Sequence, residues 1–329
     1  MKRKMNRQNR QYRAGIVGVK NIKGKLIKEV LEKMKINFKD FYLYEPGIGE
    51  YALFDSFRDE AKLVRRPEKR ELEKLDVVFF TLPVEDELFF APRVSVDLSG
   101  SRKDIVKIVS SINDDKIDSY RIANPSPATI GLSYIIHPFS EKIEYGFSTV
   151  IEPVSEYGEE AMDELFSQAV NLLNMEEIPK KVLGDVLAFD LFPKGGKKGK
   201  GRFTIEEIEL MDEIKKTNNI NEFYCSILRS GIFHRHSAIT FLKLKEDITF
   251  KKIEEMLEKS RYIVLDKEKL SPSKFDEEEG FFVHVSDIKK GENGKVWMWS
   301  VLDNLKRGSV FNAVEIGLKA LKYKDEIVS

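Results

Sequence analysis

The sequence predicts an α/β protein of two domains, and three observations support this prediction. The chain has 329 residues, more than a single ordinary hydrophobic core accommodates. In its first part, short apolar segments alternate with segments of helical periodicity, which is typical of a mostly parallel sheet whose strands are joined by helices. A strand, a glycine-containing turn and a helix follow one another at residues 14–34, the layout of a dinucleotide-binding βαβ unit.

The turn of this unit begins at Gly18 and ends at Gly24, with Asn21 midway between them. Asparagine tolerates positive φ better than most residues, so we expect the turn to form. The Asn21 side chain would, however, occupy space where the backbone closely approaches a bound pyrophosphate. The segment therefore supports the fold more strongly than it supports cofactor binding.

A second strand, at residues 41–44, is followed directly by Glu45. An acid at the end of this strand can bind a ribose 2′-hydroxyl, whereas NADP requires a cation near its additional phosphate. Residues 45–50 contain no arginine. If a nucleotide binds, the local charge favours NAD, and a simply solvated Glu45 is the equally weighted alternative.

Three further apolar runs, at residues 76–81, 94–101 and 120–123, are predicted to complete the sheet. The run at residues 76–81 is apolar without alternation, as in a strand buried on both faces. Residues 105–112 are predicted to form a helix before the last strand.

Composition excludes several classes of function. The 55 basic and 55 acidic side chains balance, so no overall charge favours nucleic acid or an anionic membrane surface. Residues 1–13 are basic but lack the apolar stretch of a signal peptide, and we interpret them as a solvated tail, with nucleic-acid contact as the less favoured alternative. No apolar run reaches the ~18 residues of a membrane helix. Without a signal peptide or a membrane helix, we expect a cytoplasmic protein. Because the chain has one cysteine and four histidines, we also expect no metal site.

Residues 123–129, Ala-Asn-Pro-Ser-Pro-Ala-Thr, resemble a motif of the aspartate-semialdehyde dehydrogenase family. In that family a strand of the nucleotide-binding domain ends in Asn-Pro-Asn-Cys-Ser/Thr-Thr, and the cysteine is the nucleophile. Asn124 and Thr129 match, Ser126 replaces an asparagine, and Pro127 stands at the position of the cysteine. Proline has neither a nucleophilic side chain nor a backbone N–H.

The resemblance continues in unbroken order from about Arg13 to Leu321, and its best-matched segments are residues 147–158, 187–193, 203–209, 229–237 and 297–317. It implies an N-terminal Rossmann-like dinucleotide-binding domain and a C-terminal α+β catalytic and dimerisation domain. We accordingly expect a basic tail at residues 1–13, a nucleotide-binding domain at 14–128 that is completed by a C-terminal helix at 305–329, and a second domain at 129–304.

The resemblance also implies roles for single residues. His236 takes the position of the acid/base histidine, and Glu152 that of a glutamine that orients the thioacyl intermediate. Substrate-binding positions are those of Arg229, Glu207, Arg102 and Asn124. The family's nucleotide turn is Gly-x-x-Gly-x-x-Gly, and the implied contacts to NAD or NADP are Gly18, Asn21, Gly24, Glu45, Asn304, Gly308 and Glu315.

Three matched positions replace an amide or a lysine of the family by glutamate: Glu152, Glu209 and Glu315. Added negative charge makes the pocket less favourable for the doubly anionic acyl phosphate that the family reduces with NADPH. We hypothesise that Glu152 instead pairs with Arg229 or His236 and closes the cleft as a structural ion pair.

Three functional classes remain open. The favoured one is a non-catalytic relative that serves as a homodimeric binding or regulatory protein with an unknown protein partner. It is favoured because Ser126 would need its own activating base and a side chain aimed at the substrate, and Cys225 lies in an apolar strand pattern, so neither is a good replacement for the nucleophile. The alternatives are an oxidoreductase of altered chemistry that uses NAD(P) and His236, and a nucleotide-binding sensor. The glycine- and lysine-rich segment 194–202 is interpreted as a solvated loop, with phosphate binding as the less favoured alternative.

Overall fold

A computed structural model describes residues 12–36, 38–49, 53–117, 120–268, 270–273 and 279–327, without the side chains of 279 and 322–327. The chain forms two compact units, the first of residues 1–108, 114–124 and 313–329 and the second of 109–113 and 125–312. The junctions thus lie a few residues from those expected at 128 and 305. Most of the expected basic tail, residues 1–11, lies outside the described residues.

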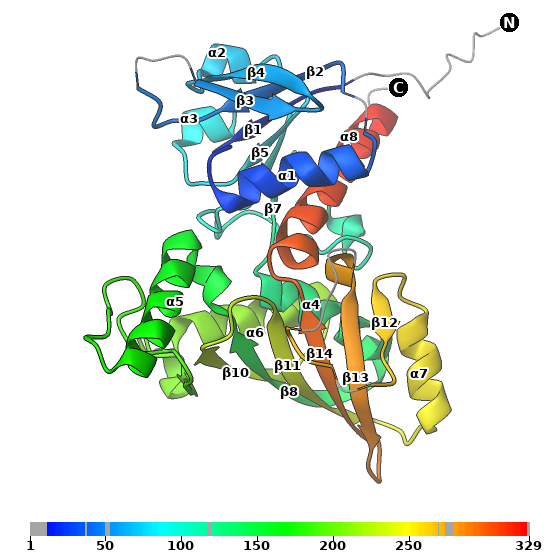
Figure 1. The fold of residues 1–329 in the computed structure, drawn as a ribbon. Coiled ribbons are helices and arrows are strands. Elements are labelled where there is room, and N and C mark those ends of the chain that lie inside the picture. The colour runs from blue at the N-terminus through cyan, green and yellow to red at the C-terminus, as the bar shows by residue number, and fades with distance from the viewer. Residues whose placement is uncertain are drawn as a thin grey trace, which may run out of the picture. The chain divides into compact units, whose positions relative to one another are not determined.

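The first unit contains a seven-stranded sheet in the order β3-β4-β2-β1-β5-β6-β7 (Figure 1). Every neighbouring pair is parallel except β3 and β4, which form an antiparallel hairpin at one edge. This confirms the mostly parallel sheet. The hairpin itself was not predicted. The strands are β1 (Arg13–Val17), β2 (Asp40–Tyr44), β3 (Leu53–Phe57), β4 (Glu60–Arg65), β5 (Val77–Phe80), β6 (Val94–Asp97) and β7 (Arg121–Ala123).

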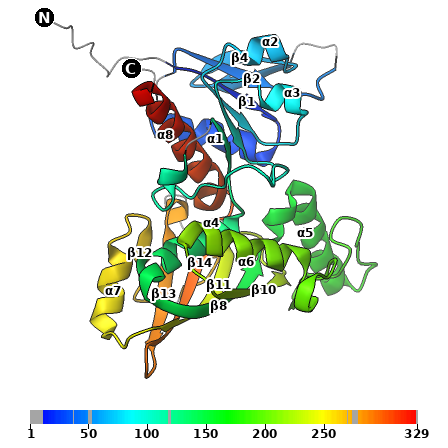
Figure 2. The same ribbon diagram turned by 180° about the vertical axis from the view of Figure 1, so that it is seen from behind.

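Helices cover both faces of this sheet. The short helices α2 (Lys69–Leu72) and α3 (Asp86–Phe89) share a core cluster with Val78 and Phe80 of β5. The intervening Phe79 contacts Gly317 of α8 (Asn312–Ile327), which therefore lies on the opposite face. Helix α1 (Ile22–Lys33) lies beside α8 in both views (Figures 1 and 2). Successive side chains of a strand point to opposite faces, which explains why β5 is apolar at every position.

The helix predicted at residues 105–112 is wrong, because residues 106–109 form no helix and residues 110–112 form a turn. Lys107 bridges Ala123 of β7 in parallel, with hydrogen bonds from the Ala123 N–H to the Val106 carbonyl (2.9 Å) and from the Ile108 N–H to the Ala123 carbonyl (3.2 Å). Ile108 and the two residues that follow it are completely buried. Ser111 is exposed and the rest of the segment is buried or half-buried, so the segment lacks the broad exposed face of an amphipathic surface helix.

The second unit is built on a mixed seven-stranded sheet in the order β12-β13-β14-β11-β8-β10-β9. The pairs β8–β10 and β12–β13 are parallel and the others are antiparallel. The strands are β8 (Ile143–Glu152), β9 (Leu191–Pro193), β10 (Phe223–Ser230), β11 (His236–Leu244), β12 (Ile263–Leu265), β13 (Val283–Lys290) and β14 (Lys295–Leu302).

One face of this second sheet is covered by α4 (Pro127–Ile136) and α6 (Ile205–Asn218), with α7 (Phe250–Glu258) near β12 (Figure 2). Their apolar residues form the main hydrophobic core with the strands. Helix α5 (Glu159–Asn174) packs instead against the segment around Leu183 and Leu187 in a separate cluster. An α+β unit therefore follows the parallel α/β unit, as expected.

The opposite face of the second sheet carries no described helix (Figure 1). Several aromatic side chains of the sheet contact one another there. Phe241 contacts Phe147 at 5.1 Å and Trp297 at 4.8 Å between ring centroids. Phe147 is 44% exposed and Ile239 is 48% exposed. A contiguous exposed apolar surface of this kind is typical of a protein–protein contact.

Candidate active site

Pro127 is the first residue of α4, and Ser126 is the N-cap of the same helix. The Ser126 hydroxyl oxygen accepts a hydrogen bond from the Thr129 N–H at 3.2 Å, and it lies 2.8 Å from the Thr129 hydroxyl. Proline is favoured at a first helical position because its missing N–H has no partner to lose there. The position matched to the nucleophilic cysteine is thus the beginning of a helix, and Ser126 is engaged in capping it.

Pro127 and His236 line one small cavity of about 20 Å³. Gly308 packs closely against Pro127, since a Cβ at position 308 would lie 3.0 Å from the Pro127 Cβ. The cavity has room for about one water molecule. The second unit therefore places the expected acid/base histidine next to the residue that replaces the nucleophile, with no thiol between them.

His236, the first residue of β11, is held by a carboxylate. Its Nε2 lies 3.2 Å from Glu156 Oε2, and the Asn304 amide donates to the same oxygen at 3.3 Å. The Asn304 carbonyl oxygen in turn accepts from the Ser155 hydroxyl at 3.2 Å. Nδ1 of His236 is buried and has no hydrogen-bond partner within the described ranges. With Nε2–H donating to Glu156, Nδ1 is the nitrogen able to accept a proton.

Glu152, at the end of β8, pairs with neither Arg229 nor His236, and our hypothesis about this ion pair is wrong. Its carboxylate accepts hydrogen bonds from Lys194 Nζ at 2.9 and 3.2 Å and from the Tyr157 hydroxyl at 2.8 Å. The side chains of Glu152 and Lys194 are both buried. Lys194, just beyond β9, reaches Glu152 because β9 and β8 flank β10 in the sheet.

Arg229, on β10, uses its two terminal guanidinium nitrogens to contact groups other than Glu152. Its Nη1 lies 3.2 Å from Asp185 Oδ2, and its Nη2 donates to the Leu183 carbonyl at 2.9 Å. The guanidinium also lies 5.0 Å from the ring centroid of Tyr157. A carboxylate ligand of Arg229 would therefore have to displace Asp185, whose side chain is 60% exposed.

Burial and ion pairing determine the protonation states of Tyr157 and its neighbour Lys194. Burial alone would lower the pKa of Lys194, but the carboxylates of Glu152 and Glu206 outweigh it and raise that pKa above its usual range. Burial, followed by the neighbouring Glu152, raises the pKa of the Tyr157 phenol. Lys194 therefore stays charged and Tyr157 stays protonated as a donor to Glu152. The interpretation of segment 194–202 as a solvated loop is wrong for its first residue.

Glu207 joins α6 to β10. It forms a capping box with Thr204, whose N–H donates to its carboxylate at 2.7 Å, and its other oxygen accepts the Ile227 N–H at 3.1 Å. Burial alone would raise the pKa of Glu207, but these backbone N–H groups hold it below its usual range.

Cys225, two residues before Ile227, is buried in the main core, and burial followed by the charge of Glu207 raises the pKa of its thiol. The only thiol of the chain is therefore an inert core side chain.

The glycine turn of the first unit is formed, with Gly18 at φ 93°. A Cβ on Gly18 would lie 2.3 Å from Thr81 Oγ1, and one on Gly24 would lie 2.3 Å from the Gly18 carbonyl oxygen, so both positions require glycine. Asn21 does not adopt the positive φ that we considered, because at φ −75° it is the extended N-cap of α1.

The fit of this turn to a dinucleotide is incomplete. The Asn21 side chain accepts the Gly24 N–H at 2.9 Å and donates to Thr81 Oγ1 at 2.8 Å. The Gly24 N–H, a donor at the N-terminus of α1 that could bind a pyrophosphate, is therefore already bonded to Asn21. Glu45 Oε2 likewise accepts the Lys20 N–H at 3.1 Å. The glycines fit a bound nucleotide, whereas Asn21 competes with it.

Three other predicted positions belong to the first unit. Arg102 pairs with Asp86, donates to the Val84 carbonyl at 2.6 Å and lies over the Phe89 ring. Asn124 follows β7 and is buried, with its N–H donating to the Asp97 carbonyl at 2.8 Å. The third is Glu315, in the first turn of α8.

Several side chains that shape this site were not predicted from the sequence: Glu156, Tyr157, Asp185 and Lys194. Glu156 and Tyr157 lie inside a matched segment, so their position was a usable signal. Asp185 and Lys194 carried no signal, because their contacts depend on how loops return to β10. Arg65 was missed for a similar reason: β4 pairs with β2, and the Arg65 carbonyl accepts the Glu45 N–H at 2.9 Å.

In the described ranges given above, no group of three or more His, Cys, Asp or Glu side chains is placed to hold a metal ion. Among the helices of those ranges, none has the length and apolar character needed to cross a bilayer.

Comparison with known proteins gives consistent matches. A family model described as "Semialdehyde dehydrogenase, dimerisation domain" matches residues 142–307. The aspartate-semialdehyde dehydrogenase of Rickettsia bellii is 24% identical over 338 residues, covering 95% of this chain and 98% of that protein. That of Bacillus subtilis is 29% identical over 231 residues, covering 64% of this chain and 66% of that protein.

Solved structures share the fold. Aspartate semialdehyde dehydrogenase II from Vibrio cholerae superposes with a TM-score of 0.86 at 22% identity, covering 95% of this chain and 99% of that one. The enzyme with NADP from Candida albicans gives 0.68 at 14% identity, covering 96% and 99%. The fold is thus that of a semialdehyde dehydrogenase, with a Rossmann-like domain and a dimerisation domain. The chain belongs to the aspartate-semialdehyde dehydrogenase family, which confirms the resemblance of its motifs.

Proposed function

We propose that this chain is a non-catalytic relative of aspartate-semialdehyde dehydrogenase that serves as a homodimeric binding or regulatory protein. The observation that carries the proposal is Pro127 at the first turn of α4, lining one cavity with His236. A thioester cannot form on proline. Ser126 caps α4 and Cys225 is buried in the core, so neither supplies a substitute nucleophile.

The pairing of the charged side chains supports the same conclusion. Arg229 is paired with Asp185 and with a backbone carbonyl, and Glu152 is paired with Lys194. An anionic substrate would have to break a buried ion pair or displace Asp185 before it reached either cation. Each such exchange costs free energy that the binding of the substrate must first offset.

Homodimer formation is supported by the aromatic face of the second sheet. The matched family model, at residues 142–307, is described as a dimerisation domain. The same residues contribute the exposed Phe147 and Ile239 on the face without a described helix. Burial of this face against a second copy would remove its apolar surface from water.

The test is an assay of phosphate-dependent oxidation of aspartate semialdehyde with NAD and with NADP. The Bacillus subtilis relative serves as the positive control. We expect no turnover above background from the wild-type chain. Any turnover by this chain would refute the proposal, and turnover that survives Cys225→Ser would show in addition that the nucleophile is not a thiol.

A second candidate is an oxidoreductase of altered chemistry that binds NAD and uses His236. It is favoured by the buried Nδ1 of His236, which has no partner among the described residues, and by the formed turn at Gly18. Calorimetric titration with NAD(H) and NADP(H) tests the nucleotide site. Binding without turnover over a panel of small aldehydes would indicate a nucleotide sensor instead, and His236→Gln should abolish any turnover found.

A further inference from the structure

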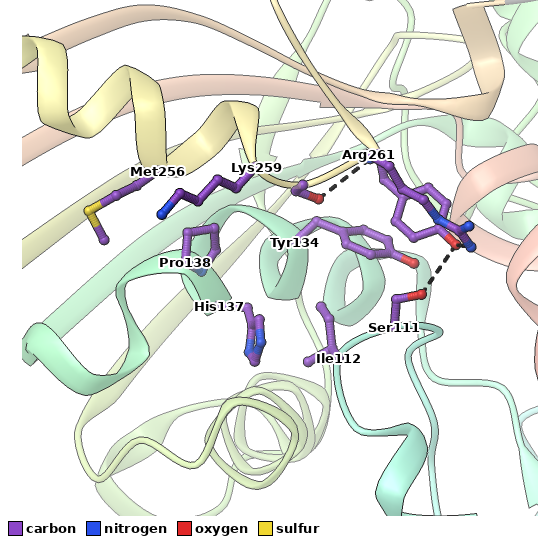
Figure 3. Close-up of a pocket in the computed structure, with 10 residues that line it drawn as sticks. Ser111, Ile112, Tyr134, His137, Pro138, Met256, Lys259 and Arg261 are labelled. Carbon is purple, nitrogen blue, oxygen red and sulfur yellow. Dashed lines mark hydrogen bonds between the residues drawn. The ribbon is translucent and has the colours of Figure 1, made fainter.

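The second unit contains a separate cavity of about 500 Å³ that shares no lining residue with the cavity at Pro127 and His236. It lies between the end of α4, the end of α7 and the segment around Ser111 (Figure 3). Its volume is within the range of small-molecule sites. None of the site residues discussed above contributes to it.

The lining combines an apolar body with basic side chains. Ile112, Pro138 and Met256 supply the apolar part. Lys259 and Arg261 supply two cations, and in Figure 3 they extend on opposite sides of the cavity. No lining residue is acidic. Lys259 ends α7, and no ion pair joins it to a carboxylate in the part of the chain that the structure describes.

The wall formed by Tyr134 and Tyr262 is backed by a third cation. The Arg307 guanidinium is completely buried, 4.3 Å from the centroid of the Tyr262 ring and 5.7 Å from that of Tyr134. The Tyr134 hydroxyl is fixed by donation to the Ser110 carbonyl at 3.0 Å. The wall is therefore formed before any ligand binds, which lowers the entropy cost of binding.

The charges around the cavity decide whether an anionic or a cationic ligand is favoured. The cavity lies at the C-termini of α4 and α7, each of which contributes about −0.5 charge. Lys259 lines the cavity with no carboxylate partner among the described residues, Arg261 also lines it, and no lining residue is acidic, so the side chains of the lining bring positive charge to these helix ends. An anionic group in this cavity would be attracted, and a cationic one would be repelled.

We propose that this cavity binds a small organic anion, with its carboxylate or phosphate near Lys259 and its apolar body against Met256, Pro138 and Ile112. The inference does not depend on the proposed function, because it concerns other residues and requires no catalysis. Carboxylate and phosphate share the charge that Lys259 recognises, and the experiment below distinguishes them.

The experiment uses the full chain with [methyl-13C]methionine, in which Met256→Leu identifies the Met256 signal. The probes are benzoate, phenyl phosphate and the neutral benzamide. We expect saturable shifts of the Met256 methyl with benzoate or phenyl phosphate, and at least about fivefold weaker binding of benzamide. The tighter of the two anions identifies the preferred charged group.

Two variants of α7 make the test specific. Lys259→Met removes the charge but keeps the length of the side chain, and we expect it to weaken binding of the anion about fivefold. Lys251→Met is the matched control, because Lys251 is on the same helix with its side chain 85% exposed, and it should bind as the wild type does. The proposal is overturned if neither anion saturates by about 20 mM, if benzamide binds equally well, or if Lys259→Met binds like the wild type.

Discussion

Lys194 Nζ lies 2.9 Å from Glu152 Oε2, and the exposed fractions of the two side chains are only 14% and 8%. This ion pair replaces the contact that we expected between Glu152 and either Arg229 or His236. Tyr157 completes it, since its hydroxyl donates to the same carboxylate and both cations, Lys194 and Arg229, lie near its ring. Glu152, Lys194, Tyr157 and Arg229 thus form one contiguous cluster within the second unit.

Lys194→Met should destabilise the protein by about 3 kcal/mol, because it leaves the Glu152 carboxylate buried without its cation. Urea unfolding measures the loss. Lys197→Met is the matched control from the same segment, where Lys197 is exposed, and it should change stability by less than about 0.5 kcal/mol. The double variant Lys194→Met/Glu152→Gln should recover part of the loss. Equal stability of Lys194→Met and the control would contradict the role of the pair.

Glu207→Gln should cost about 1–2 kcal/mol at pH 7, because one of two carboxylate oxygens that accept backbone N–H groups is lost. The pKa of Glu207 is lowered in the folded protein, so its stabilisation is complete above its unfolded pKa of about 4.3 and is lost as the pH falls through the folded value. The difference between wild type and variant should therefore shrink below about pH 4. Glu258→Gln, at an exposed position in α7, is the control. A difference that is constant from pH 7 to pH 3 would argue against the carboxylate contacts.

Phe147→Arg should convert a dimer to a monomer, because the substitution places a charge in the centre of the exposed aromatic face. Sedimentation equilibrium of the wild type should give twice the chain mass, and the variant should give the chain mass. Phe54→Arg, at a phenylalanine of the first unit that is 62% exposed, should leave the mass unchanged. A wild-type monomer, or a Phe147→Arg dimer of unchanged affinity, would contradict the assignment of this face.

Asn21→Gly should strengthen NAD binding, because it frees the Gly24 N–H and the space in the turn for a pyrophosphate. The same change removes the cap of α1 and the hydrogen bond to Thr81, so it should cost about 1 kcal/mol of stability. Calorimetric titration measures the first effect and thermal unfolding the second. Asn21→Ala also loses the helix cap but keeps a Cβ, so it separates the effect of the lost cap from the effect of the freed space. Weaker nucleotide binding by Asn21→Gly than by the wild type would show that Asn21 contributes to the site.

Cys225 should react with iodoacetamide at pH 8 on the order of a hundredfold more slowly in the native protein than in urea. Burial and the nearby Glu207 raise the pKa of its thiol, so the reactive thiolate is scarce and inaccessible in the folded state. Mass spectrometry after timed quenching measures the rate. Native reactivity close to that of the unfolded chain would return Cys225 to consideration as a nucleophile.

Strands β1, β2, β5, β6 and β7 and helix α1 could be predicted from the sequence because they follow from local patterns. The continuous apolar run at β5 and the helical spacing of α1 each reflect burial of a single element. Residues 105–112 show the limit of such reasoning. Their apolar residues fit a helix, but Ala123 of β7 forms hydrogen bonds with Val106 and Ile108, which keep this part of the segment out of a helix.

Sequence alone determined the family and the absence of a cysteine at position 127, because both depend on residue identity at matched positions. Only the tertiary structure decided which charges are paired. Glu152 meets Lys194, 42 residues away, and His236 meets Glu156, 80 residues away. A charged side chain is buried only with a partner that compensates its lost hydration, and packing of distant segments chooses that partner.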